Sequence, residues 1–233
     1  MNFFKRVSSR LKKMLSKVAP IGVKDYFDEV EFGLKPIEIG TQKTYYKNIK
    51  TARCPFDYVM YQMIIFELKP DLIIEIGTSE GGSCIYYADL LDIIGKGMIH
   101  TIDITDNRVN PQDENANHSR VKFFTDGYKN YDLKNAEGYE TILIIDDGSH
   151  TYEDVLASLK KFNSLVSVSS YFIVEDGIID HLGVEVSKWF NGGPNRAIKE
   201  FLINNDSFII DRKWCDFFGK NATFNTNGYL KKI

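Results

Sequence analysis

From about residue 57 onward, the chain alternates short apolar stretches with amphipathic ones, and this alternation limits the folds it can adopt. The apolar stretches are near-continuous runs of Ile, Leu, Val and Phe, which are typical of parallel strands covered by helices on both faces. We expect strands at 72–76, 98–104, 121–124, 141–146, 171–175 and 207–210, and helices at about 57–68, 82–94, 151–166 and 195–204. The pattern predicts an α/β fold with a doubly wound, mostly parallel, Rossmann-like sheet. The closing stretch TFNTNGYLKKI predicts a final strand at the edge of this sheet.

The 233 residues divide into three expected parts: a helical arm over 1–20, an irregular cap segment over 21–56, and the main domain over 57–233. The first 18 residues carry six Lys or Arg and no acid, and their apolar residues recur at helical spacing. One interpretation is a basic amphipathic helix that contacts an anionic membrane surface. The other is an arm that docks on its own domain or on a second subunit. We also expect a homo-oligomer.

Composition excludes several classes of protein. A net charge of −3 gives no reason to expect nucleic acid as a partner. The three cysteines, Cys54, Cys84 and Cys215, lie far apart, which argues against a disulfide framework or a zinc knuckle and for a reduced compartment. No apolar run approaches the ~18 residues that would span a bilayer. We therefore expect a cytoplasmic protein, with contact to the inner membrane face as one interpretation of the arm.

Acidic residues end, or closely follow, five of the predicted strands. Ligands of open α/β sheets bind beyond the carboxyl ends of the strands, near the point where the strand order reverses. A buried carboxylate at such a place is costly unless a partner or a metal satisfies it. The acids are Glu75, Asp103, Asp126, the pair Asp146 and Asp147, and the pair Glu175 and Asp176. Their placement predicts a ligand site at this edge of the sheet.

The first of these loops, LIIEIGTSEGGS at 72–83, has the pattern strand, glycine-rich turn, helix. Such a turn lets the backbone and the free N–H groups of a helix approach a cofactor closely. A phosphate-binding P-loop would need a lysine after Gly82, and Ser83 stands there. A dinucleotide fingerprint would need a second glycine where Ser79 stands.

The remaining pattern, E-x-G-x-x-x-G, resembles the first motif of class I S-adenosylmethionine (SAM) methyltransferases, and the resemblance implies that fold and that cofactor. It implies that the glycine turn approaches the amino-acid part of SAM, that Asp103 binds the ribose hydroxyls, and that Asp126 lies near the adenine. The cofactor-binding residues expected on this basis are Glu75, Gly77, Thr78, Ser79, Gly81, Ser83, Asp103, Asp126 and Asp146.

The runs IDDGSH at 145–150 and VEDG at 174–177 follow two further strands. Neighbouring parallel strands lie ~4.8 Å apart, so Asp147, Glu175 and Asp176 can converge on one point. Three carboxylates are ligands for Mg²⁺ or Ca²⁺ rather than zinc, and Mg²⁺ is the metal we expect. Asp146 remains the alternative to Asp147 as a ligand.

These runs look like the metal-dependent macrolide-sugar O-methyltransferases, and residues 54–233 resemble the cephalosporin hydroxylase and rhamnosyl O-methyltransferase family. The resemblance implies Asp147, Glu175 and Asp176 as metal ligands, with Asp147 and His150 as catalytic residues and His150 as the general base. It implies methyl transfer from SAM to a hydroxyl of a vicinal diol on a small-molecule acceptor, a sugar or a glycosylated natural product. Three aromatic residues, Tyr152, Trp189 and Trp214, are candidates either for stacking on a sugar or for the core.

Two rival functions stay open. The name cephalosporin hydroxylase implies an oxidoreductase, but the sequence has neither an iron facial triad nor a clear nicotinamide fingerprint. A non-catalytic SAM-binding scaffold is the second rival. Such a scaffold needs no metal ligands, so the presence of acids at both the cofactor and the metal positions argues against it.

Overall fold

The structure is a computed structural model that describes residues 33–108 and 117–233. The predicted basic arm lies outside the described residues, as does the part of the predicted cap segment before residue 33. Internal contacts divide the chain into two compact units, Met1–Ile39 and Gly40–Ile233. Within the first unit the described residues are 33–39, where helix α2 (Leu34–Thr41) begins. None of the helices in the described ranges is both long and apolar enough to cross a membrane.

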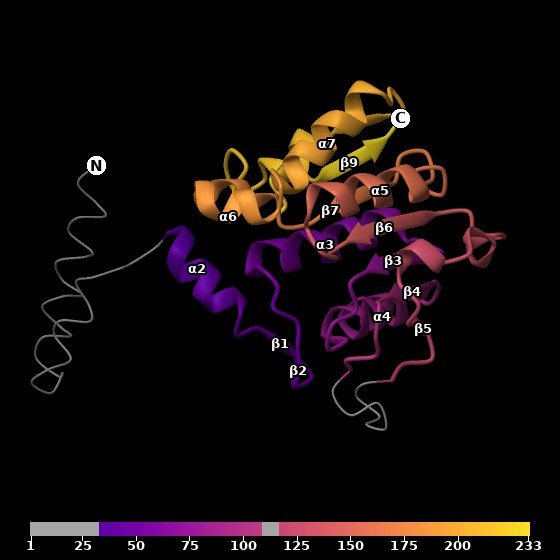
Figure 1. Ribbon diagram of the computed structural model, residues 1–233. Helices are drawn as coiled ribbons and strands as arrows, with labels where there is room; N and C mark the ends of the chain where they lie inside the picture. Colours follow the sequence, from indigo (N-terminus) through magenta and orange to yellow (C-terminus); the bar gives the residue numbers. More distant parts are fainter. Residues whose placement is uncertain (1–32, 109–116) are drawn as a thin grey trace, which may run out of the picture. The chain divides into compact units, whose positions relative to one another are not determined.

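The second unit is built on a seven-stranded sheet (Figure 1). Its strands are β3 (Leu72–Ile76), β4 (Met98–Ile102), β5 (Val121–Phe124), β6 (Ile142–Asp146), β7 (Tyr171–Val174), β8 (Phe208–Ile210) and β9 (Tyr229–Lys232). The spatial order is β5-β4-β3-β6-β7-β9-β8, and the pairs from β5 to β7 are all parallel. The predicted doubly wound, mostly parallel sheet is confirmed.

The position of the last strand differs from the prediction. β9 is not an edge strand but lies between β7 and β8, antiparallel to both. Tyr229 and Leu230 are fully buried there, which gives two large apolar side chains cover on both sides of the strand. β8 forms the edge instead, and its half-exposed Ile209 suits that place.

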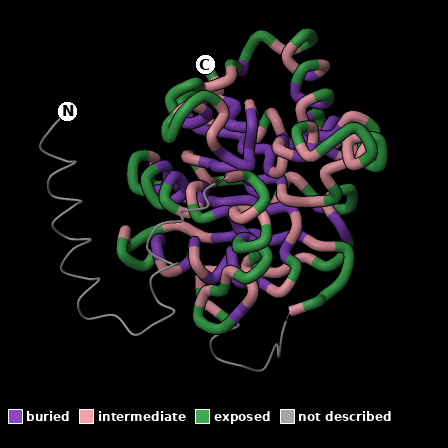
Figure 2. Tube along the Cα trace, turned by 90° about the vertical axis from the view of Figure 1, so that its left-hand side faces the viewer, coloured by how far each residue is buried: buried purple, intermediate pink, exposed green. Residues whose placement is uncertain are grey.

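Helices cover both faces of the sheet. They are α3 (Pro55–Leu68), α4 (Gly82–Ile94), α5 (Tyr152–Phe162), α6 (Val184–Trp189), α7 (Gly193–Ile203) and α8 (Arg212–Cys215), with short 3₁₀ helices η3 (Tyr128–Asn130), η4 (Leu133–Ala136) and η5 (Gly177–His181). Successive strand residues face opposite sides. In β3, Ile73 packs into a core with α3 and α4, whereas Leu72 and Ile74 pack into a second core with α5 and α7. The buried residues, purple in Figure 2, run through the interior.

The segment before α3 is more regular than the predicted irregular cap. Besides α2, it contains a hairpin of β1 (Tyr45–Tyr46) and β2 (Ile49–Lys50), joined by Lys47 and Asn48 at positive φ. A two-residue turn with both φ values positive fits the twist of paired strands. Strands of two residues are too short to produce a sequence period, which is why the pattern did not reveal them.

Candidate active site

A cavity of about 590 Å³ opens at the carboxyl ends of the strands, where the strand order reverses between β3 and β6. Residues that end or follow four strands line it: Ile76 and Gly77 after β3, Ile102 and Asp103 after β4, Asp146 and Asp147 after β6, and Asp176 after β7. This is the place where open α/β sheets bind ligands.

The glycine loop is fixed by close contact with the β6 loop. Gly77 has φ +97°, and a Cβ on it would lie 2.0 Å from the backbone oxygen of Asp147. Its N–H donates to the Ile102 carbonyl at 2.8 Å, and the Asp147 N–H donates to the Ile76 carbonyl at 2.8 Å. A side chain at position 77 would separate these loops, so glycine is required here.

Asp103 is held with its carboxylate at the cavity. The backbone N–H of Ser79 donates to its Oδ2 at 2.8 Å, and the N–H of Ile104 donates to its Oδ1 at 2.7 Å. Each carboxylate oxygen can accept more than one hydrogen bond, so capacity remains for a pair of ligand hydroxyls. Asp126 is exposed and does not line the cavity, whereas the next two residues, Gly127 and Tyr128, do.

Four other predicted cofactor residues lie behind the loop rather than in the cavity lining. Glu75 is fully buried and accepts hydrogen bonds from the hydroxyls of Ser83 at 2.5 Å and Thr101 at 2.6 Å. Thr78 bonds Thr101 at 2.7 Å, and Gly81 precedes the first turn of α4. Burial raises the pKa of Glu75 to about 7, against the lowering effect of Arg53. These residues hold the glycine loop in place through contacts outside the cavity lining.

The structure brings Asp147, His150 and Asp176 together. Each offers one ligand atom, and these atoms lie within 4.8 Å of one another. His150 Nε2 is 3.8 Å from Asp147 Oδ1 and 3.4 Å from Asp176 Oδ2. His150 and Asp176 both have positive φ, +58° and +55°, a costly conformation that tends to occur at functional sites. The two carboxylates at this spacing can hold a divalent cation, with the imidazole beside it.

The side chains of Glu175 and Asp146, which precede Asp176 and Asp147 in the sequence, do not join this cluster and have other partners. Glu175 is 4% exposed, forms an ion pair with Arg53 and accepts a hydrogen bond of 2.7 Å from the Tyr61 hydroxyl. Asp146 accepts hydrogen bonds from the Ser158 hydroxyl on α5 and from the Gly148 N–H at 3.3 Å. Burial raises the pKa of Asp146 to about 6.

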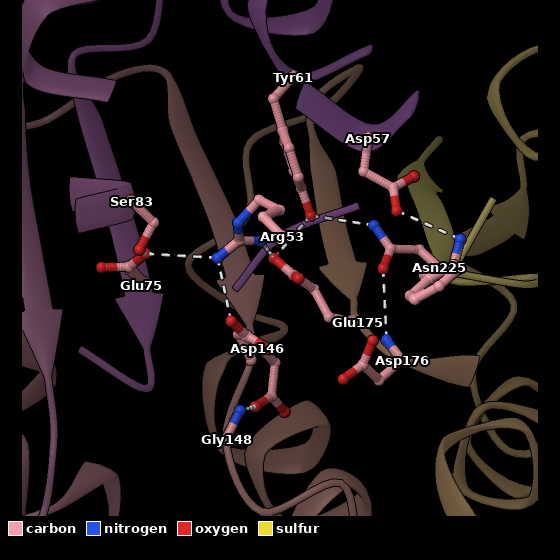
Figure 3. A network of polar contacts seen from close by, with 12 residues as sticks. Arg53, Asp57, Tyr61, Glu75, Ser83, Asp146, Gly148, Glu175, Asp176 and Asn225 are labelled. Carbon is pink, nitrogen blue, oxygen red and sulfur yellow. Dashed lines mark hydrogen bonds and ion pairs between the residues drawn. The ribbon is translucent and has the colours of Figure 1, made fainter. Parts of the chain in front are cut away.

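Sequence reasoning missed Arg53, which lies at the centre of these acids (Figure 3). Its side chain is 2% exposed, and Nη2 is 3.0 Å from Asp147 Oδ2 and 3.9 Å from Glu75 Oε1. The only signal was a charged residue directly before CPFDYVM, the start of an apolar helix. A single sequence does not say which acids such a cation meets.

The three aromatic candidates occupy different environments. Trp214 is 1% exposed and belongs to the core. The guanidinium carbon of Arg196 lies 3.8 Å from the ring centroid of Tyr152, and the Tyr152 hydroxyl donates a hydrogen bond to Glu200. Trp189 is 79% exposed on α6. The next residue, Phe190, has its ring centroid 6.4 Å from that of His150, so the end of α6 borders the acidic cluster.

The family of the chain follows from comparison with known proteins. A family model described as rhamnosyl O-methyltransferase/CmcI matches residues 40–233. The rhamnosyl O-methyltransferase of Mycobacterium tuberculosis is 32% identical over 180 residues, which cover 73% of this chain and 70% of that protein. The protein of the same name from Mycobacterium leprae (strain TN) is 30% identical over 199 residues, 80% of this chain and 82% of that one.

Solved structures agree on the fold. A CmcI structure described as containing Mg and SAM has a TM-score of 0.63 at 20% identity and covers 92% of this chain and 85% of that chain. The SAH-bound methyltransferase PaMTH1 of Podospora anserina has a TM-score of 0.55 at 16% identity, covering 91% and 92%. This architecture is the predicted class I methyltransferase fold. The chain therefore belongs to the rhamnosyl O-methyltransferase/CmcI family.

Proposed function

We propose that this protein is a metal-dependent O-methyltransferase that moves a methyl group from SAM to a hydroxyl of a vicinal diol on a sugar or glycosylated natural product. The observation that carries the proposal is the composition of one cavity. Its lining includes Gly77, Ser79 and Asp103 on the side of β3 and β4, and Asp147, His150 and Asp176 after β6 and β7. A cofactor cradle and an acidic cluster thus face a single space.

In this proposal the first half of the lining binds SAM. Asp103 accepts hydrogen bonds from the two ribose hydroxyls with the capacity that Ser79 and Ile104 leave free. Gly77 and Ser79 present backbone to the amino-acid part, supported by Glu75, Thr78, Gly81 and Ser83. Asp126 remains a proposed adenine contact from outside the lining. The similar structure of CmcI with Mg and SAM supports the choice of cofactor.

The second half of the lining would hold the metal. Asp147 and Asp176 contribute ligand atoms to the cluster, and Glu175, although it bonds to Arg53, directly precedes Asp176. The orientation of Asp146 toward Ser158 favours Asp147 as the ligand of that pair. Bound Mg²⁺ would orient the acceptor diol and lower the pKa of its hydroxyl by Lewis-acid polarisation.

His150 is the proposed general base. Its Nε2 faces Asp147 and Asp176, and its ring lines the cavity. A carboxylate within 4 Å stabilises the imidazolium that forms when His150 takes the proton of the acceptor hydroxyl. The enclosing loops then contribute by holding acceptor oxygen and methyl donor in one orientation.

The acceptor class rests on the relatives, whose name identifies a rhamnosyl group as the methylated part. The exposed Trp189, beside the end of α6 that borders His150, offers a surface for stacking on a sugar ring. Oligomerisation, contact of the arm with a membrane and a cytoplasmic location remain predictions from the sequence.

Calorimetric titration of the full chain with SAM, once with Mg²⁺ and once with EDTA, tests the cofactor half of the proposal. We expect saturable binding of one SAM per chain with Mg²⁺ present. Absence of binding in both conditions would reject a methyltransferase function. SAM binding with no transfer to glycosides in either condition would favour a SAM-binding scaffold instead.

A further inference from the structure

One buried cation joins the carboxyl ends of three strands. Among the residues that the structure describes, Arg53 is the only buried Lys or Arg. Its guanidinium contacts Glu75 near the end of β3 and Glu175 after β7, both labelled in Figure 3, and also Asp147 after β6. Guanidinium is planar and presents several donors in a fixed arrangement, so it can hold two carboxylates at a set distance and angle.

Arg53 is itself held firmly. The ring centroids of Tyr61 and Tyr87 lie 5.3 and 5.8 Å from its guanidinium carbon. Its backbone N–H donates to Thr44 Oγ1 at 2.8 Å. The preceding strand β2 packs closely against Gly82 at the start of α4. A Cβ on Gly82 would lie only 2.5 Å from the Lys50 carbonyl oxygen. The chain thus fixes both the backbone and the side chain of this arginine.

Arg53 contacts one carboxylate oxygen of Asp147 and one of Glu175. Nη2 bonds Asp147 Oδ2 at 3.0 Å, while Asp147 Oδ1 faces His150 Nε2 at 3.8 Å. Nη1 pairs with Glu175 Oε1, the same atom that accepts from the Tyr61 hydroxyl. Asp147 therefore uses one oxygen to anchor itself and keeps the other at the cluster with His150 and Asp176.

We propose that Arg53 is the positioning residue of the metal centre: it holds one oxygen of Asp147 so that the other oxygen faces the divalent cation, while Glu175 anchors the guanidinium. This inference rests on the proposed function, because it requires that a metal binds there. Partners that orient metal ligands typically account for 10–100-fold in metal affinity. Arg53 would act through Asp147 and not by touching the substrate.

Charge and orientation act in opposite directions here. The positive charge of Arg53 repels a cation, so its removal alone would raise metal affinity. Loss of orientation lowers the affinity. Arg53→Lys separates the two effects, since lysine keeps the charge but offers a single ammonium in place of the planar fork.

The experiment is a titration of the full chain with Mn²⁺, with free Mn²⁺ followed by electron paramagnetic resonance. We expect Arg53→Lys to weaken Mn²⁺ binding by ~10–100-fold relative to the wild type. We expect calorimetric SAM affinity to fall much less than Mn²⁺ affinity, because Arg53 does not contact Asp103 or Gly77 and its Nη2 lies 3.9 Å from Glu75 Oε1. The matched control is Arg212→Lys, which makes the same change in an exposed pair with Asp216 and should leave Mn²⁺ affinity unaltered.

Tyr61→Phe is the second variant, in case Arg53→Lys does not fold. It removes the hydroxyl that donates to Glu175 and accepts from the Asn225 amide, and it keeps the ring beside Arg53. Glu175, the partner of Arg53 Nη1, is then held less firmly, so Mn²⁺ binding should weaken severalfold. Wild-type Mn²⁺ affinity in the folded Arg53→Lys protein, or in Tyr61→Phe when Arg53→Lys is unfolded, would overturn the inference. If the wild type binds SAM but no Mn²⁺, the metal-dependent function itself fails and this inference fails with it.

Discussion

The backbone oxygen of Asp147 lies only 2.0 Å from the position that a Cβ on Gly77 would take. This contact joins the loop that we assign to the cofactor with the residue that we assign to the metal. The two halves of the site are therefore in direct contact and not merely adjacent. A change at either residue should affect both ligands.

Replacing Gly77 by alanine tests this contact. The new methyl group would collide with the β6 loop and would also occupy φ +97°. We expect a loss of roughly 2–4 kcal/mol in the free energy of unfolding, with loss of SAM binding. Gly95→Ala is the control, since Gly95 has φ +86° but nothing within 4 Å of its Cβ position. Equal losses in urea unfolding for the two variants would mean that the contact with Asp147 costs nothing.

Asp103→Asn should weaken SAM binding while the protein remains folded. The amide lacks the negative charge and one acceptor oxygen, and a hydrogen bond to a charged group contributes about 1.5–3 kcal/mol. We expect at least a roughly tenfold loss of SAM affinity by calorimetry. Asp126→Asn is the comparison, and its exposed position outside the lining predicts a smaller loss. A larger loss for Asp126→Asn would reverse the proposed roles.

His150→Gln and Asp147→Asn should impair methyl transfer in different ways. Loss of the base should lower kcat by ~10²–10⁴. Loss of the carboxylate charge at position 147 should instead raise the Mg²⁺ concentration needed for half-maximal rate. The measurement is the initial rate of SAM turnover against Mg²⁺ concentration for both variants. Rates of both variants equal to the wild-type rate at every Mg²⁺ concentration would contradict the mechanism.

His100 should make folding stability depend on pH. It is buried in β4 and bonds the Tyr131 hydroxyl at 2.7 Å, and burial lowers its pKa from 6.5 to about 4. Between pH 6.5 and 4 the unfolded state binds a proton that the folded state does not. Stability from His100 is therefore present above pH 6.5 and is lost as the pH falls toward 4, by roughly 3 kcal/mol in all.

The test compares urea unfolding of the wild type and His100→Gln at pH 7.5, 5.5 and 4.5. Buried acids with raised pKa, such as Asp57 and Glu75, contribute with the opposite sign, but they are present in both proteins and cancel in the difference. We expect the stability advantage of the wild type to shrink as the pH falls. A difference that does not change with pH would show that His100 has no such effect.

The strands were predictable because their apolar runs are long and bounded by turn residues. β3 and β5 have the predicted limits, and β4, β6, β7 and β8 differ by two residues at most at either end. The place of β9 was not predictable, since a chain-terminal strand can pair at the edge or insert between two others. The sequence pattern of such a strand is similar in both cases.

The acids at the strand ends were predictable as a group but not individually. Successive residues of an extended chain point to opposite sides, so the two members of an acidic pair do not both join one cluster of ligand atoms. Asp147 and Asp176 join the cluster with His150, whereas Asp146 turns toward Ser158 and Glu175 bonds to Arg53. Which member turns inward depends on neighbours that are distant in the sequence.

The measurement that tests the account most directly is methyl transfer itself. The wild type would be incubated with SAM and a set of rhamnosides with free vicinal hydroxyls, with Mg²⁺ or with EDTA, and methylated product would be quantified by mass spectrometry. We predict product with Mg²⁺ and almost none with EDTA, with recovery when Mg²⁺ is restored. Equal product in EDTA would contradict the central claim that the acids after β6 and β7 hold a metal needed for the reaction.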